Sequence, residues 1–223
     1  MTPHDLSLDL AQAMLALKGE AAAHRSLLDR ASAALLAEPM TGRWWHTRPG
    51  VGDAVRDYLA AHLLRHLREG DRGSEATDLV FRLEWLRETL QRCGPGGLVS
   101  TVTAQAAWAR IAGRDASPGD AAELRLLVQA LKLSAAALRS PRALDALPDQ
   151  LAGRLQGVLR GEGRGARPRI RALVEEALVW RGPGGPAFRL RPVCPSLLQA
   201  GGACERVLAG HTGPVTCVAV LDE

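Results

Sequence analysis

Apolar residues recur every three or four positions along most of the chain, which is the period of an amphipathic α-helix. This spacing predicts helices over residues 4–17, 20–37, 51–68, 98–111, 117–139, 144–159 and 170–178, with one or two more between 74 and 93. The start of 117–139 is the clearest, because Ser117 stands in the N-cap position and Pro118 follows it at the first helical position. Gly94-Pro95-Gly96-Gly97 predicts a turn.

The pattern changes after residue 180. Glycine and proline recur too often between 181 and 206 for a long helix, so this part is predicted to be a linker. Residues 207–223 contain one apolar run, Val215–Val220, without a second run long enough to pair with it. We therefore predict an all-α fold, either a multi-helix bundle or a superhelical arm, with a short incomplete β segment at the C-terminus that is not a stable strand alone.

Composition narrows the class of protein. Apolar residues make up 47% of the 223 residues, which excludes a disordered chain, and the net charge of +4 is modest. The four cysteines (93, 194, 204 and 217) lack C-x-x-C spacing, which argues against a zinc site. Their scattered positions favour free thiols in a reducing, intracellular setting. No signal peptide and no apolar run of about 18 residues is present, so a cytoplasmic location is expected.

Candidate chemistry in the helices is sparse. His62 and His66 are four residues apart on one helix face, as in metal-binding pairs, but the Glu of H-E-x-x-H and an evident third ligand are missing. Ordinary helix histidines are the preferred interpretation, and no metal is predicted. No nucleophile with a placed base is found, so the chain is not expected to be an enzyme.

Two further stretches admit both a functional and a structural interpretation. Trp44-Trp45 lies between glycines and prolines and could anchor a partner, but packing on a neighbouring helix is favoured. Trp85, Trp108 and Trp180 are expected to fill the core or grooves. The arginine-rich run 160–171 could bind phosphate backbones, but it has no interleaved aromatic residue and is interpreted as a solvated loop between helices.

Four stretches together resemble one family. They are Pro3-His4-Asp5-Leu6, residues 78–86, residues 124–134 with 148–155, and Gly210-His211 before an apolar run. In this order they resemble the signalling ATPases of the STAND (NB-ARC) class, related to apoptotic protease-activating factor, that carry a C-terminal WD-repeat propeller. Pro3 stands where the family's Met-His-Asp motif has its methionine.

The resemblance implies a domain order. Residues 1–18 would be the remnant of a winged-helix end, 19–180 a helical arm, 181–206 a linker and 207–223 the start of a first WD-repeat blade. A blade needs about 40–45 residues, so this one is incomplete. Gly210 and His211 would be its structural motif. His4 would contact the nucleotide only together with an ATPase core that this chain does not contain.

The function implied is that of a non-catalytic scaffold or regulatory segment, which links a nucleotide-switched NB-ARC module to a WD-repeat sensor and transduces signals by protein–protein interaction. The chain has no G-x-x-x-x-G-K-[ST] loop, so no cofactor is predicted, and ADP or ATP would matter only in a full-length context. Expected partners are proteins or the rest of a larger polypeptide, without a membrane and without nucleic acid. The alternative is a basic helical domain that binds nucleic acid.

Overall fold

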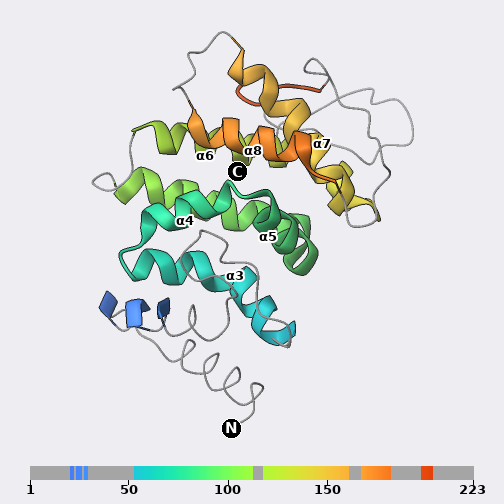
Figure 1. Ribbon diagram of the computed structural model, residues 1–223. Coiled ribbons are helices and arrows are strands. Elements are labelled where there is room, and N and C mark those ends of the chain that lie inside the picture. The colour runs from blue at the N-terminus through green and yellow to red at the C-terminus, as the bar shows by residue number, and fades with distance from the viewer. Residues whose placement is uncertain are drawn as a thin grey trace, which may run out of the picture.

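The described part of the chain is entirely helical and irregular, without a β-strand. A computed structural model describes residues 21–22, 24–26, 28–29, 53–112, 118–160, 167–181 and 197–202. The residues described between 21 and 29 are helical and are called here the N-terminal helical segment. Figure 1 shows this segment beside α3, on the side away from α6, α7 and α8. The predicted all-α fold is confirmed for these residues.

The helices follow the predicted pattern closely. Their bounds are α3 Asp53–Glu69, α4 Gly73–Val80, α5 Leu83–Ala112, α6 Pro118–Leu133, α7 Ala143–Leu155 and α8 Pro168–Val179, with 3₁₀ turns η1 Ala137–Arg139 and η2 Gln156–Leu159. The region 74–93 does contain two helices, because Phe81 and Arg82 separate α4 from α5.

Two predicted boundaries were wrong. The turn over 94–97 is reduced to a break at Gly94, whose φ of 69° lies in the left-handed region, and Pro95 then begins a second stretch of α5. The helix predicted to reach Arg139 ends as an α-helix at Leu133. There the Ser134 hydroxyl donates to the Ala130 carbonyl and accepts from the buried Arg154, and the chain continues into η1.

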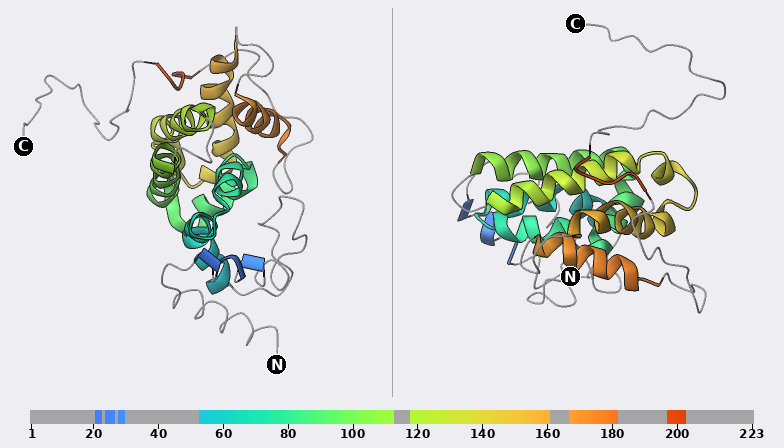
Figure 2. Two further views of the ribbon diagram at one scale, coloured as in Figure 1. Left: turned by 90° about the vertical axis from the view of Figure 1, so that its left-hand side faces the viewer. Right: turned by 90° about the horizontal axis from the view of Figure 1, so that it is seen from above.

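The core is built around α5. This helix contacts α3, α4, α6, α7 and α8, and Figure 2 shows α5 and α6 running side by side. Trp85, near the start of α5, is fully buried, as predicted. Trp108 and Trp180 are partly buried against the core, and the Arg87 guanidinium lies 4.4 Å from the ring centroid of Trp180. No helix in the described ranges combines the length and apolar character needed to span a membrane.

Several predicted features lie outside the described residues. These are the predicted winged-helix remnant 1–18 with His4, the Trp44-Trp45 loop, and the predicted blade start with Gly210 and His211. The Val215–Val220 run and all of the linker 181–206 except Arg181 and 197–202 are outside as well.

A carboxylate caps the start of α5 across the core. Glu176 of α8 accepts a hydrogen bond of 3.1 Å from the Leu83 backbone N–H, and burial raises the pKa of its carboxyl despite this bond. A raised folded-state pKa means that the folded protein binds the proton more tightly than the unfolded chain. Stability contributed by this group is therefore lost as pH rises through the window from the unfolded value of 4.5 to the raised pKa.

Replacing this carboxylate by an amide isolates its effect. Glu176→Gln keeps an acceptor for the Leu83 N–H and removes a partly buried charge, so we expect the variant to be equal to or up to about 1 kcal/mol more stable than wild type at neutral pH. Urea unfolding of both proteins from pH 4 to pH 8 measures the difference in their unfolding free energies. This difference should shrink toward pH 4, where the wild-type carboxyl is protonated. A variant clearly less stable at neutral pH would contradict this.

Candidate functional site

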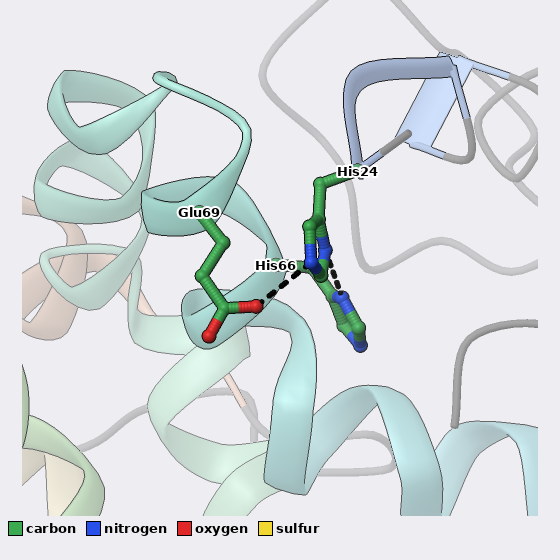
Figure 3. A group of neighbouring side chains, drawn as sticks. All are labelled: His24, His66 and Glu69. Carbon is green, nitrogen blue, oxygen red and sulfur yellow. Dashed lines mark hydrogen bonds and ion pairs between the residues drawn. The ribbon is translucent and has the colours of Figure 1, made fainter. Parts of the chain in front are cut away.

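A cluster of two buried histidines, His24 and His66, and the partly exposed Glu69 joins the N-terminal helical segment to α3 (Figure 3). His66 and Glu69 are three residues apart, so they share one face of α3. His24 comes from the other segment and points at both. Next to the cluster, Leu28 of the N-terminal helical segment is fully buried. Apolar packing thus brings His24 to the end of α3.

The polar atoms of the cluster follow one another at short distances. Tyr58 Oη lies 2.7 Å from His66 Nε2, and His66 Nδ1 lies 2.9 Å from His24 Nδ1. His24 Nε2 in turn lies 2.9 Å from Glu69 Oε2. Only 1% of His24 and 4% of His66 is exposed, which is low for ionisable side chains.

The last link of this series is incomplete. Although His24 Nε2 and Glu69 Oε2 are within 2.9 Å, they are not aligned as a hydrogen bond, and both are buried atoms without a hydrogen-bond partner among the described residues. The distance therefore reflects proximity of charge and dipole rather than a hydrogen bond. Two facing polar atoms in this state are unusual in a protein interior, because each carries a desolvation cost.

The environment sets the charge of each group. Burial, followed by the nearby His24, lowers the pKa of His66 to about 4, so its imidazole is neutral at neutral pH. Partial burial would raise the pKa of Glu69, but the hydrogen bond and charge of Arg65 hold it below its usual value. Arg65 Nε donates to Glu69 Oε1 at 2.7 Å, which leaves Oε2 facing His24. The cluster thus offers neutral imidazole and ionised carboxylate, the forms that bind metals.

The predicted histidine pair separates in the structure. His66 belongs to the cluster, whereas the His62 ring packs against Tyr58 at a centroid distance of 4.7 Å. Sequence reasoning missed His24 and Glu69. The His-x-x-Glu spacing at 66–69 was a visible signal for one pair, but nothing local marks His24, which is 42 residues away from His66.

A second feature is the docking of residues 197–202 onto the helical body. Arg154 of α7 is nearly buried and donates to the Leu198 carbonyl, Ser134 Oγ and Gln150 Oε1 at 3.0, 3.0 and 3.1 Å. The Ala200 N–H donates back to the Arg154 carbonyl at 3.1 Å, and Ala200 is 1% exposed. We call this set the exit anchor.

The exit anchor extends to α6. Gln129 accepts from the Gly201 N–H at 2.6 Å and donates to the Gly202 carbonyl at 3.2 Å. Leu197 contacts the surface of Gly153 on α7. Residues 197–202 thus contact α6 and α7, because Gly153 leaves room for Leu197 and the Arg154 side chain offers donors to the backbone.

A basic groove runs between α5 and α6, with Gly202 at its edge. Its cavity volume is ≈ 720 Å³, and its lining includes the apolar Ala106 and Val128 and the cations Arg110, Arg125 and Lys132. These three cations make no ion pair with another residue in the described ranges. The groove could therefore receive an anionic group.

The basic run 160–171 is only partly described by the structure. One of its arginines, Arg169, forms ion pairs within the fold. Arg169 pairs with Asp78 at 2.6 Å and also with Asp120. The Ile170 N–H donates to Glu123 at 2.7 Å, which fixes the start of α8 on α6. Arg169 thus serves helix packing, and residues 161–166 lie outside the described part.

Comparison with known proteins gives no relative: no protein-family model matches the chain, and neither a curated protein nor a solved structure matches it.

Proposed function

We propose that the chain is a non-catalytic helical arm of a STAND-type signalling protein. It links a nucleotide-switched NB-ARC module to a WD-repeat sensor and acts through protein–protein contacts. The sequence resemblance suggests the class, and the exit anchor is the observation that supports the mechanical role most directly. Adenine nucleotide would be bound by the module outside this chain.

The exit anchor matters because a mechanical link transmits movement only where the connected parts are held to it. The side chains of Arg154 and Gln129 form hydrogen bonds with backbone atoms of residues 198–202, not with their side chains. The path of the chain is thereby fixed to α6 and α7 just before the predicted blade start. A sensor that changes its contacts on ligand binding would then shift the helical body with it, which is how a ligand biases two arrangements.

Nucleic-acid binding is the second candidate, and the basic groove favours it. Arg110, Arg125 and Lys132 face one cavity without an acidic residue in its lining. Against it, Arg169, Arg92 and Arg72 are engaged in ion pairs within the fold. Affinity for nucleic acid depends on unpaired cations that can displace counterions. Because these three arginines are already paired within the fold, we favour the helical-arm function over nucleic-acid binding.

The proposal is tested first on the coding sequence around this chain. We expect a G-x-x-x-x-G-K-[ST] loop encoded upstream and further WD repeats downstream, on the same or an adjacent reading frame. The absence of both from the surrounding coding sequence would contradict the proposal.

Binding assays on the purified chain separate the two candidates. We expect calorimetry with ADP to give no micromolar site, and fluorescence anisotropy with generic RNA and duplex DNA to show no saturable binding at low salt. A micromolar ADP site weakened by His4→Ala would contradict the first expectation. Salt-sensitive nucleic-acid binding that is lost in the triple variant Arg110→Ala, Arg125→Ala, Lys132→Ala would favour the second candidate instead.

A further inference from the structure

We propose that His24, His66 and Glu69 form a divalent-cation site, of the kind that binds Zn²⁺, which fastens the N-terminal helical segment to α3. One ligand atom can be taken from each residue so that all three lie within 4.8 Å of one another. This site goes beyond the proposed function, and its failure would leave the helical-arm proposal untouched.

The unpaired atoms identify two of the ligands. His24 Nε2 and Glu69 Oε2 face each other, are buried and have no hydrogen-bond partner among the described residues. A cation between them would satisfy both at once. Zinc ligands of one tetrahedral site are roughly 3.3 Å apart, given metal–ligand distances of about 2.0–2.2 Å. The observed 2.9 Å separation therefore needs only a small outward shift.

His66 supplies the third ligand through Nδ1. Its Nε2 is already held by Tyr58 Oη at 2.7 Å, and a metal on Nδ1 would replace the 2.9 Å contact between this nitrogen and His24 Nδ1. With the metal on Nδ1, the proton sits on Nε2 and is donated to the Tyr58 oxygen. Such an outer partner fixes the ring orientation, as is usual for metal-binding histidines.

Glu69 has the corresponding support. Arg65 Nε donates to Oε1, so the carboxylate is oriented with Oε2 toward His24. Each α3 ligand is thus positioned by a residue of the same helix. A plain hydrogen-bonded chain would need the His24–Glu69 link to be aligned, and it is not.

The ligand set selects the metal. Two imidazoles and one carboxylate suit zinc and its first-row neighbours, whereas Mg²⁺ and Ca²⁺ prefer oxygen ligands alone. The cluster supplies three ligands from the described residues, so the fourth position would be left to water. The two imidazoles come from different helical segments, so the ion would cross-link them.

Titration of the metal-stripped full chain with Zn²⁺ tests the site. Calorimetry at neutral pH should give one ion per chain, with a dissociation constant of roughly 1 μM or tighter. Glu69→Gln, His24→Gln and His66→Gln should each remove this binding. Glu69→Gln is the safest of these, because the residue is partly exposed and the amide has the same shape. Far-UV circular dichroism confirms the fold of each variant.

Two further variants sharpen the test. His62→Gln removes an imidazole from the same helix, one turn from His66, and should bind Zn²⁺ as wild type does. Tyr58→Phe deletes only the outer hydrogen bond and should weaken binding about 10- to 100-fold. Thermal unfolding should show a higher midpoint with Zn²⁺ than with chelator in wild type and in His62→Gln, but not in Glu69→Gln.

The outcomes are decisive. Absence of stoichiometric Zn²⁺ binding by wild type would overturn the proposal and leave a hydrogen-bonded cluster only. Binding that survives both His24→Gln and Glu69→Gln would overturn it as well. Substitution with Co²⁺ should give the visible bands of a tetrahedral site without a thiolate charge-transfer band. A strong thiolate band would place the ion on cysteines and would also refute the assignment.

Discussion

Arg154→Ala is expected to cost about 3 kcal/mol of unfolding free energy, because charged hydrogen-bond donors are worth more than neutral ones and this side chain makes three such bonds. It should also release the exit anchor before the rest of the protein unfolds. The Ala200 amide, which donates to the Arg154 carbonyl, should then exchange with solvent about 100-fold faster, since each 1.4 kcal/mol of local opening is tenfold.

Urea denaturation and amide hydrogen exchange measure the two effects. Arg154→Lys keeps the charge but loses the forked geometry, so it should fall between wild type and alanine. Arg139→Ala, at the exposed end of η1, is the matched control and should change neither quantity appreciably. Unaltered protection of Ala200 in Arg154→Ala would remove the main support for the proposed mechanical role.

Gly73→Ala is expected to destabilise the protein by about 2 kcal/mol, although alanine normally favours a helix. Gly73 begins α4 and is buried, and the six-membered ring of Trp108 from α5 lies directly on it. A Cβ placed there would overlap this ring, so α4 and α5 would have to separate or the indole would have to leave its position. Thermal or urea unfolding measures the loss.

A double-mutant cycle shows whether the overlap is the cause. In a Trp108→Ala background the space above residue 73 is open, so Gly73→Ala should become neutral or stabilising by up to about 1 kcal/mol. The sign of the substitution is therefore expected to reverse. Equal destabilisation in both backgrounds would show that Trp108 is not responsible.

The sequence predicted the helices well because their signals are local. Leu59, Leu63 and Leu67 repeat at the helical period, and all three are buried on α3 as that period requires. Gly94 was also recognisable as a break. The length of the break was not predictable, because proline is typical both of a turn and of the first position of a helix, and here the helix resumes at Pro95.

The functional features were harder to predict because they depend on distant parts of the chain. Nothing near His24 indicates that it meets Glu69, and a histidine on a helix is ordinary in isolation. Arg154 would be assigned to the surface by its type, yet the returning segment 197–202 covers it. Both features result from tertiary packing.

The position of α5 has a consequence for how the molecule comes apart. In a solenoid each helical unit contacts only its neighbours, so a terminal unit can melt alone. Here α3, α4, α6, α7 and α8 all contact one helix. Loss of α5 would expose five apolar faces at once, so the body from α3 to α8 should unfold as a single cooperative unit. A chain truncated within α5 should therefore leave no fragment that folds stably. Proteolytic cleavage at the Gly94 break should likewise unfold the whole body from α3 to α8.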